Sequence, residues 1–423
     1  AEQFTAGIDY VRLYLDESDF EAEEFAVLSN LSSLISNLDT KNYSAAKLQT
    51  EIDTYTGGIF GRVSLFENQE GHIQPYFVLA GKALESSLDK LIELMKEIFI
   101  HTEFTNTNDI LKLTQRFISG FGSTINNASH RLVANRALSQ VKPISKINEY
   151  TGGIDHFNYL KETRDALTND AGEDIGEKLA AVLERLLNKE RLNVLYIGDA
   201  DRVDNVKTKV ATAFEDLPSM ALGDAVVYKP GPKRNEAFIT AQDVNYVGAG
   251  TDALEIFDYS GATNVLSSAI RFDYLWNEIR VKGGAYGSMY NHRRNSSLAF
   301  GSYRDPNIQK TLDVYKNLPR YVENLSISEE ELNKYIIGSI SPLEQPKSAA
   351  SKGLSALSRL KTGISAEDII KLKEEILATE SAELSTYAES IEKTLEDMAI
   401  VVIGNKTQIE EEKDLFDEIH TLY

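Results

Sequence analysis

The chain has 423 residues and a formal net charge of −21, from 44 lysine and arginine residues against 65 aspartate and glutamate residues. This length predicts two or three domains. Because binding to nucleic acid and to anionic lipid depends on neutralising negative charge, we expect no nucleic-acid and no membrane partner, whereas a basic or extended peptide remains compatible. The 42% hydrophobic and 26% charged fractions indicate a globular protein.

Cysteine is absent, which excludes disulfides, thiol nucleophiles and cysteine-ligated metal sites. This is compatible with a reducing compartment, and we expect a cytoplasmic location. No apolar run approaches the roughly 18–20 residues that span a bilayer. The sequence opens at Ala1 with neither a methionine nor a signal peptide, which suggests a processed or truncated product.

Strand and helix patterns alternate through the first half of the chain. In chain order, the apolar spacing predicts a strand at Ile8–Leu15, helices at Asp19–Leu38 and Ser44–Tyr55, strands at Gly57–Phe66 and Gln74–Ala80, helices at Leu84–Phe99 and Asn108–Ser139, a loop around Thr151–His156, a helix at Asp174–Asn188, a buried strand at Leu192–Ile197, and a helix ending at Phe214.

A segment rich in proline and glycine, Leu217–Asn235, then breaks the pattern and is typical of an inter-domain linker. We therefore predict a first domain at 1–216, a linker at 217–235 and a second domain at 236–423.

The second half repeats the order of the first. In chain order, we expect strands up to about Ile256, a helix near Thr263–Arg280, strands starting at Gly283 and at Ser297–Tyr303, a helix at Ile308–Leu325, a helical run from Ser328 to about Leu395, a buried strand at Met398–Ile403, and a last helix to Ile419.

Short matches support an internal repeat. Gly57-Gly58-Ile59-Phe60-Gly61 matches Gly283-Gly284-Ala285-Tyr286-Gly287, Phe77 matches Phe300, and Tyr196-Ile197-Gly198-Asp199 matches Val402-Ile403-Gly404-Asn405. Each match is weak alone, but the order of elements agrees throughout. We predict an α+β protein of two homologous domains, each a mostly antiparallel sheet packed against helices.

Motifs for metal or nucleotide chemistry are scarce. None of the six histidines forms the helical His-Glu-x-x-His or His-x-x-Glu-His pair that binds zinc, so we assign no metal to this chain. Neither a Gly-x-Ser-x-Gly elbow nor a phosphate-binding Gly-x-x-x-x-Gly-Lys-Ser/Thr loop is present. Gly248–Ala253 fits the loose dinucleotide pattern Gly-x-Gly-x-x-Ala, but no helix and parallel strand follow, so a plain turn is favoured.

The segment from Arg271 to Gly287 differs from the rest of the chain. It contains the only tryptophan, and a helix end, the glycine pair Gly283-Gly284 and a strand start follow one another closely. A glycine pair at a strand entry permits close approach by another backbone. In a strand starting near Ala285, Tyr286 would share a face with Ser288 and Tyr290.

Arg280 and Tyr286 would then converge, offering a fixed positive charge and a phenol donor to one oxygen. This pairing suits oxyanion stabilisation in acyl transfer. On spacing alone, a surface arginine and a packed tyrosine are the favoured interpretation.

The run Ile279-Arg280-Val281-Lys282-Gly283-Gly284-Ala285-Tyr286-Gly287, followed by Ser302-Tyr303-Arg304-Asp305-Pro306-Asn307, resembles the C-terminal half of the presequence-protease branch of the pitrilysin/insulinase zinc peptidases, the inverzincins. Gly7-Ile8-Asp9-Tyr10-Val11 and Tyr55-Thr56-Gly57-Gly58-Ile59 resemble the third domain of that branch. The resemblance covers essentially the whole chain and is most specific around Arg280–Gly287.

The resemblance implies an enzyme of four homologous α+β domains, in two halves that close around an unfolded peptide. Its N-terminal half binds zinc through a His-x-x-Glu-His helix, and its C-terminal half contributes an arginine and a tyrosine. By motif match these are Arg280 and Tyr286, with Gly283 and Gly284 in the substrate-binding segment. The zinc helix is absent here, so the expected partners are a peptide substrate and a zinc-binding half, and the isolated chain is expected to hold no zinc and to be inactive.

A second hypothesis is a naturally non-catalytic peptide-binding or scaffold subunit of a peptidase pair. The presence of both Arg280 and Tyr286 argues mildly against it, because a pure scaffold does not need the pair.

Overall fold

In the computed structural model, residues 2–169 and 172–422 are described. The chain forms two compact units. The first unit comprises Ala1–Phe121, Tyr150–Tyr228 and Pro346–Gly363, and the second comprises Gly122–Glu149, Lys229–Gln345 and Ile364–Tyr423. The chain passes from one unit to the other at residues 228 and 229, inside the predicted linker. A cut at the linker would nevertheless assign residues 122–149 and 346–363 differently, so the exact domain boundaries stay a prediction.

The first unit is built on a four-stranded antiparallel sheet in the order β2-β3-β1-β4. Its strands are β1 (Ile8–Asp16), β2 (Ile59–Glu67), β3 (Ile73–Leu84) and β4 (Leu192–Ile197). In β1 the apolar residues Val11, Leu13 and Leu15 alternate with more polar ones and are buried, as expected for a strand with one face on the core.

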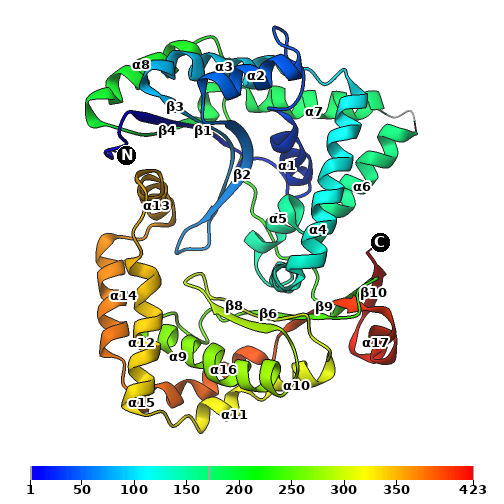
Figure 1. The fold of residues 1–423 in the computed structure, drawn as a ribbon, viewed down its shortest axis with the longest axis vertical. Helices are drawn as coiled ribbons and strands as arrows, with labels where there is room; N and C mark the ends of the chain where they lie inside the picture. Colours follow the sequence, from blue (N-terminus) through cyan, green and yellow to red (C-terminus); the bar gives the residue numbers. More distant parts are fainter. Residues whose placement is uncertain (1, 170–171, 423) are drawn as a thin grey trace. The chain divides into compact units, whose positions relative to one another are not determined.

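Helices cover both faces of this sheet. Helices α3 and α8 lie along one side (Figure 1), and Leu357 of α13 packs on the other side against Tyr14 and Tyr76. The helices of the first unit are α1 (Glu24–Leu34), α2 (Ala45–Tyr55), α3 (Leu88–His101), the first part of α4 (Thr107–Ser139), α6 (Ile154–Thr168), α7 (Gly172–Leu186), α8 (Val203–Ala213) and α13 (Ala349–Thr362).

The second unit is built on a six-stranded sheet in the order β10-β5-β9-β6-β8-β7. The pairs β10–β5 and β5–β9 are parallel, and the remaining pairs are antiparallel. The strands are β5 (Glu236–Thr240), β6 (Tyr246–Asp252), β7 (Gly287–His292), β8 (Ser297–Tyr303), β9 (Ala399–Asn405) and β10 (Glu418–Thr421).

Two layers of helix enclose the second sheet. Helices α9 and α16 lie on one side (Figure 1), where they bury the largest apolar cluster of this unit, and residues 129–139 of α4 pack on the other. The helices of this unit are α5 (Pro143–Gly152, which reaches into the first unit), α9 (Gly261–Ala269), the π-helix η4 (Ile270–Val281), α10 (Gln309–Lys316), α11 (Leu318–Glu323), α12 (Glu329–Glu344), α14 (Ala366–Ala378), α15 (Ser381–Leu384), α16 (Ala388–Leu395) and α17 (Lys406–Glu411).

The strand order supports the internal repeat. Order β2-β3-β1-β4 in the first sheet corresponds to β7-β8-β6-β9 in the second, with the same sequence of strands along the chain. The second glycine of each matched pair, Gly58 and Gly284, has a positive φ of 111° and 84°, respectively. The predicted α+β class, with mostly antiparallel sheets packed against helices, is confirmed.

Two predicted elements are wrong. The loop expected at Thr151–His156 is instead the meeting point of α5 and α6, where only Gly153 interrupts the helices. The last helix expected to reach Ile419 ends at Glu411, and Glu418–Thr421 forms β10 beside β5. The acidic residues that precede β10 have high helix propensity, but its pairing with β5 is a long-range contact that a local pattern does not contain.

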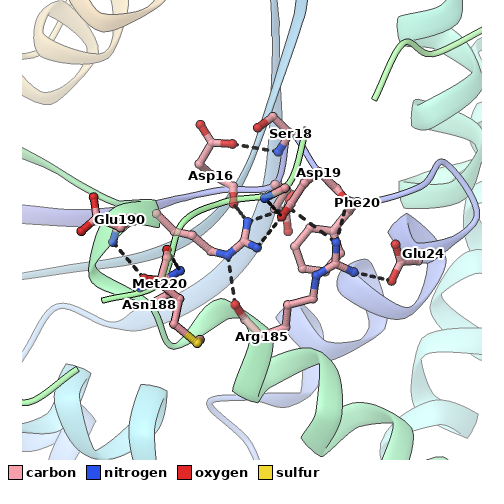
Figure 2. Close-up of polar contacts among 12 residues, drawn as sticks. Asp16, Ser18, Asp19, Phe20, Glu24, Arg185, Asn188, Glu190 and Met220 are labelled. Atoms are coloured by element: carbon pink, nitrogen blue, oxygen red, sulfur yellow. Dashed lines mark hydrogen bonds and ion pairs between the residues drawn. The ribbon is translucent and has the colours of Figure 1, made fainter. Parts of the chain in front are cut away.

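Long-range polar contacts fix part of the proline- and glycine-rich segment to the first unit. Asp19 accepts hydrogen bonds from Arg191 at 2.7 and 2.8 Å and from the Gly223 amide at 3.1 Å, and the Asn188 amide donates to the Met220 carbonyl at 2.8 Å (Figure 2). Burial alone would raise the pKa of Asp19, but these hydrogen bonds hold it below its ordinary value. This part of the segment is therefore ordered without being a helix or a strand.

No helix within the described residues has the length and apolar character needed to cross a membrane.

Candidate functional site

Arg280 lies in the last turn of η4, a π-helix that continues directly from α9. Its guanidinium carbon is 4.1 Å from the centroid of the Trp276 ring and 5.5 Å from that of Tyr286. In a π-helix the backbone bond runs from residue i+5 to residue i, as Lys282 N–H donates to the Asn277 carbonyl at 2.9 Å. Trp276 and Arg280 are thus placed on neighbouring turns of one helix face.

The glycine pair makes the turn from this helix into β7. A Cβ on Gly283 would lie 2.4 Å from the Ile279 carbonyl oxygen, so no larger residue fits without a shift of backbone. Gly284 has a φ of 84°, which other residues rarely adopt. Asn307 fixes the turn from outside by donating to the Gly283 carbonyl at 2.7 Å. Both glycines are therefore required by geometry, and they bring Tyr286 back toward Arg280.

Tyr286 directly precedes β7, and its amide extends the strand ladder by donating to the Tyr303 carbonyl at 2.9 Å. Its ring contacts the Tyr303 ring edge-on at 5.5 Å and is 65% exposed. Tyr290, expected on the same face, is only 1% exposed and packs on Phe300 in the core. The structure thus brings Arg280 and Tyr286 together but separates Tyr290 from them.

A pocket of about 490 Å³ lies beside Tyr286 in the second unit. Its wall includes His130 and Arg131 of α4, together with Tyr303 and Met289 of the sheet. The His130 ring contacts the Tyr303 ring at 5.1 Å, and burial, followed by the charge of Arg131, lowers the pKa of His130. His130 is therefore neutral near pH 7, and the pocket offers aromatic surface next to the exposed phenol.

The charge of Arg280 is not neutralised locally. Among the residues that the structure describes, no carboxylate forms an ion pair with it, whereas the neighbouring Lys282 pairs with Glu278 at 2.6 Å. A guanidinium held on an aromatic ring keeps its N–H donors available for an acceptor. With the phenol of Tyr286 beside it, the arrangement can bind a carbonyl or carboxylate oxygen of a ligand.

Sequence reasoning identified Arg280, Tyr286, Gly283 and Gly284 but assigned no role to Trp276. The isolated tryptophan in the same helix was the available signal. It also missed His130, which lies more than 150 residues from Tyr286 in the chain and carries no motif.

The dinucleotide pattern has a structural explanation. Gly248 and Gly250 lie within β6 and face α4, where a Cβ on Gly248 would come within 2.7 Å of Val133 and one on Gly250 within 2.8 Å of the Leu138 amide. These glycines allow the helix to pack closely on the strand. The fit to a nucleotide-binding loop is therefore incidental.

One group of side chains in the described part of the chain brings possible metal ligands within 4.8 Å of one another: Glu236, Glu418 and His420. Glu236 is already bound by Arg136 at 2.7 and 2.8 Å, and Glu418 forms an ion pair with Arg234. Carboxylates compensated by guanidinium groups are poor ligands for a divalent ion. The residues present therefore do not fit a zinc site.

Comparison with protein families agrees with this architecture. The model for the associated domain of subfamily C of the M16 peptidases matches residues 1–162, and the model described as PreP C-terminal domain matches residues 235–406.

Individual relatives extend the match over the whole chain. Protein HypA of Clostridium perfringens is 32% identical over 99% of this chain and 43% of its own length. Presequence protease 1 of Arabidopsis thaliana is 26% identical over 96% of this chain and 38% of its own length. The chain thus spans less than half the length of these relatives. In fold it is similar to a peptidase M16 inactive domain from Pseudomonas fluorescens, with a TM-score of 0.64 and 13% identity over 96% of this chain and 94% of that one.

The two family models and the presequence-protease relatives together show that the chain belongs to the M16 peptidase family, as a C-terminal half of the presequence-protease type.

Proposed function

We propose that this chain is the substrate-binding half of a zinc-dependent oligopeptidase that encloses and hydrolyses unfolded peptides. Family membership supports the reaction class, and the relatives named presequence protease support a peptide substrate. The observation that carries the proposal is the guanidinium of Arg280, which lies on Trp276 beside the exposed phenol of Tyr286 without a carboxylate partner among the described residues.

In this proposal, Arg280 and Tyr286 act on the scissile carbonyl of the peptide. Guanidinium N–H groups and the phenol O–H donate to the carbonyl oxygen, where negative charge develops as the carbon becomes tetrahedral. Donors positioned in advance stabilise this charge more than they stabilise the substrate, which accelerates the reaction. The zinc of the other half supplies a nucleophilic water at neutral pH.

Trp276, Gly283 and Gly284 act through the pair. Trp276 holds the flexible arginine side chain in one place, an interaction typically worth about 0.5–2 kcal/mol. The two glycines set the turn on which the separation of Arg280 from Tyr286 depends.

The test uses the full peptidase, in which this chain is combined with its zinc-binding half. Arg280→Ala is expected to lower kcat/KM by about 10²–10³-fold, the usual loss for one oxyanion donor. Arg280→Lys should recover only part of it, because lysine keeps the charge but lacks the planar donor fork. Lys282→Ala, two residues away and paired with Glu278, is the matched control and should keep wild-type kinetics.

Two results would contradict the proposal. Wild-type kinetics in Arg280→Ala would assign the chain to the scaffold class. One tightly held zinc per isolated chain, measured by elemental analysis, would show that the metal lies in this half. We expect the isolated chain to hydrolyse no peptide.

A further inference from the structure

The outer edge of β4 is open in the first unit. One side of β4 pairs with β1 along its length. On its other side, the described residues provide only a single parallel bridge, between Glu2 and Gly198, with a hydrogen bond from the Gln3 amide to the Gly198 carbonyl at 2.9 Å. Val194 in the middle of the strand is 45% exposed. An apolar strand edge of this kind is a site for pairing with another strand.

An apolar groove lies beside this edge, between β4 and α8. Its volume is about 730 Å³. Apolar side chains from both elements line most of it: Leu192, Val194, Val203, Val206, Val210 and Phe214. The groove is therefore suited to apolar side chains that project from an added strand.

The second unit shows what occupies the corresponding place there. By strand order, β9 corresponds to β4, and α17 follows β9 as α8 follows β4. The outer edge of β9 is covered by β5, which runs parallel to it from Glu236 opposite Val401 to Thr240 opposite Asn405. Ala237 of β5 and Ile409 of α17 are both fully buried in one apolar cluster, with Ile239 packed against it. In this unit, the space between strand and helix is filled by a parallel strand.

The register of the two units agrees at one point. In the second unit, Ile239 of β5 lies opposite Gly404, and in the first unit Glu2 lies opposite Gly198, which the internal repeat matches to Gly404. Both pairings are parallel. The bridge at Glu2 therefore has the position that the C-terminal part of β5 has in the other sheet, and a strand equivalent to β5 would lie directly before Glu2.

We propose that β4 and the groove beside α8 bind a fifth strand, parallel to β4 and formed by an extended segment joined to the chain directly before Glu2. Apolar side chains at every second position of this strand enter the groove, as Ala237 and Ile239 pack beside α17. The strand that completes the first sheet thus comes from the segment that leads into this half, so docking of that segment and stability of the sheet are coupled.

The test adds a strand to the chain and measures hydrogen exchange in β4. The extension Thr-Val-Thr-Val-Thr-Val before Ala1 directs valine toward α8, by analogy with the position of Ala237. The matched control, Val-Thr-Val-Thr-Val-Thr, has the same composition but presents valine to the opposite face, because a one-residue slip reverses the faces of a strand. We expect the first extension to slow exchange of the Leu192–Ile197 amides by about tenfold or more, and the control to have little effect.

A second variant tests the groove itself. Val210→Lys in α8 places a charge in the groove on the surface of the helix, and it should abolish the added protection while leaving the exchange of β1 and β3 unchanged. Equal protection by both extensions, or none by either, would overturn the proposal. Concentration-dependent protection of β4 in the unextended chain, together with dimers in sedimentation, would show that a second copy occupies the edge and would overturn it as well.

Discussion

Arg136, near the end of α4, joins two buried carboxylates of the second unit. Its guanidinium binds Glu236 of β5 through two contacts at 2.7 and 2.8 Å and Glu149 of α5 at 3.3 Å. Glu236 and Glu149 are 2% and 0% exposed, respectively. One cation therefore compensates two carboxylates that water does not reach, and it links α4, α5 and β5.

Arg136→Met keeps most of the side-chain volume and removes the charge. Removing one partner of a buried ion pair typically costs about 3–5 kcal/mol, because the remaining charge is left without compensation. Gln140 still donates to Glu236 at 3.0 Å, and Asn135 to Glu149 at 2.7 Å, so the loss should lie within that range rather than above it. Adding Glu236→Gln to the Arg136→Met variant should recover part of the loss, since one uncompensated charge is then removed.

Guanidinium unfolding followed by fluorescence is the suitable assay. The single tryptophan, Trp276, lies in the second unit and reports the unfolding of that unit. Lys393→Met removes an exposed ion pair with Glu389 from the same unit and should leave the transition unchanged. A loss below about 1 kcal/mol in Arg136→Met would refute the reasoning, because it would show that the two carboxylates are not destabilising when left without the arginine.

Three further predictions concern stability. Burial raises the pKa of Glu17, whose carboxylate oxygens have no hydrogen-bond partner; the folded state therefore binds more protons than the unfolded state between the two pKa values, and Glu17→Gln should raise the thermal midpoint of the first unit at pH 8 more than at pH 4.5. Burial lowers the pKa of His156 to about 4, so stability present at neutral pH should decline between about pH 6.5 and 4, and His156→Gln should flatten this decline in pH-dependent unfolding. Gly261→Ala should cost about 1–3 kcal/mol in denaturant unfolding because its Cβ would lie 2.3 Å from α14, whereas Gly338→Ala in α12, with open space around it, should be neutral or stabilising.

Much of the fold follows from local patterns. The predicted strand Ser297–Tyr303 coincides with β8, because its apolar residues are bounded by polar turns on both sides. The packing of distant helices does not follow. Leu357 of α13 would satisfy the apolar surface of either sheet, and only the tertiary structure shows that it packs on the first. Likewise, the non-helical backbone at Ala128, which kinks α4, has no proline to signal it.

The candidate site was predictable in part. Arg280 and Tyr286 are six positions apart, and the glycine pair between them already implied a tight turn that brings them close. The aromatic contact between Tyr286 and Tyr303 depends on the register of β7 with β8, and the approach of His130 depends on how α4 crosses the sheet. Both are long-range features, and neither can be derived from the spacing of residues in one segment.

The most direct test of the proposed role of this half removes a single oxygen atom. In the full peptidase with its zinc-binding half, Tyr286→Phe should lower kcat by about 10²–10³-fold without loss of zinc. Tyr290→Phe removes the same atom four residues later, where the hydroxyl is buried without a hydrogen-bond partner, and should keep wild-type kcat. Equal kcat values for Tyr286→Phe and the wild type would contradict a role for this half in the chemical step.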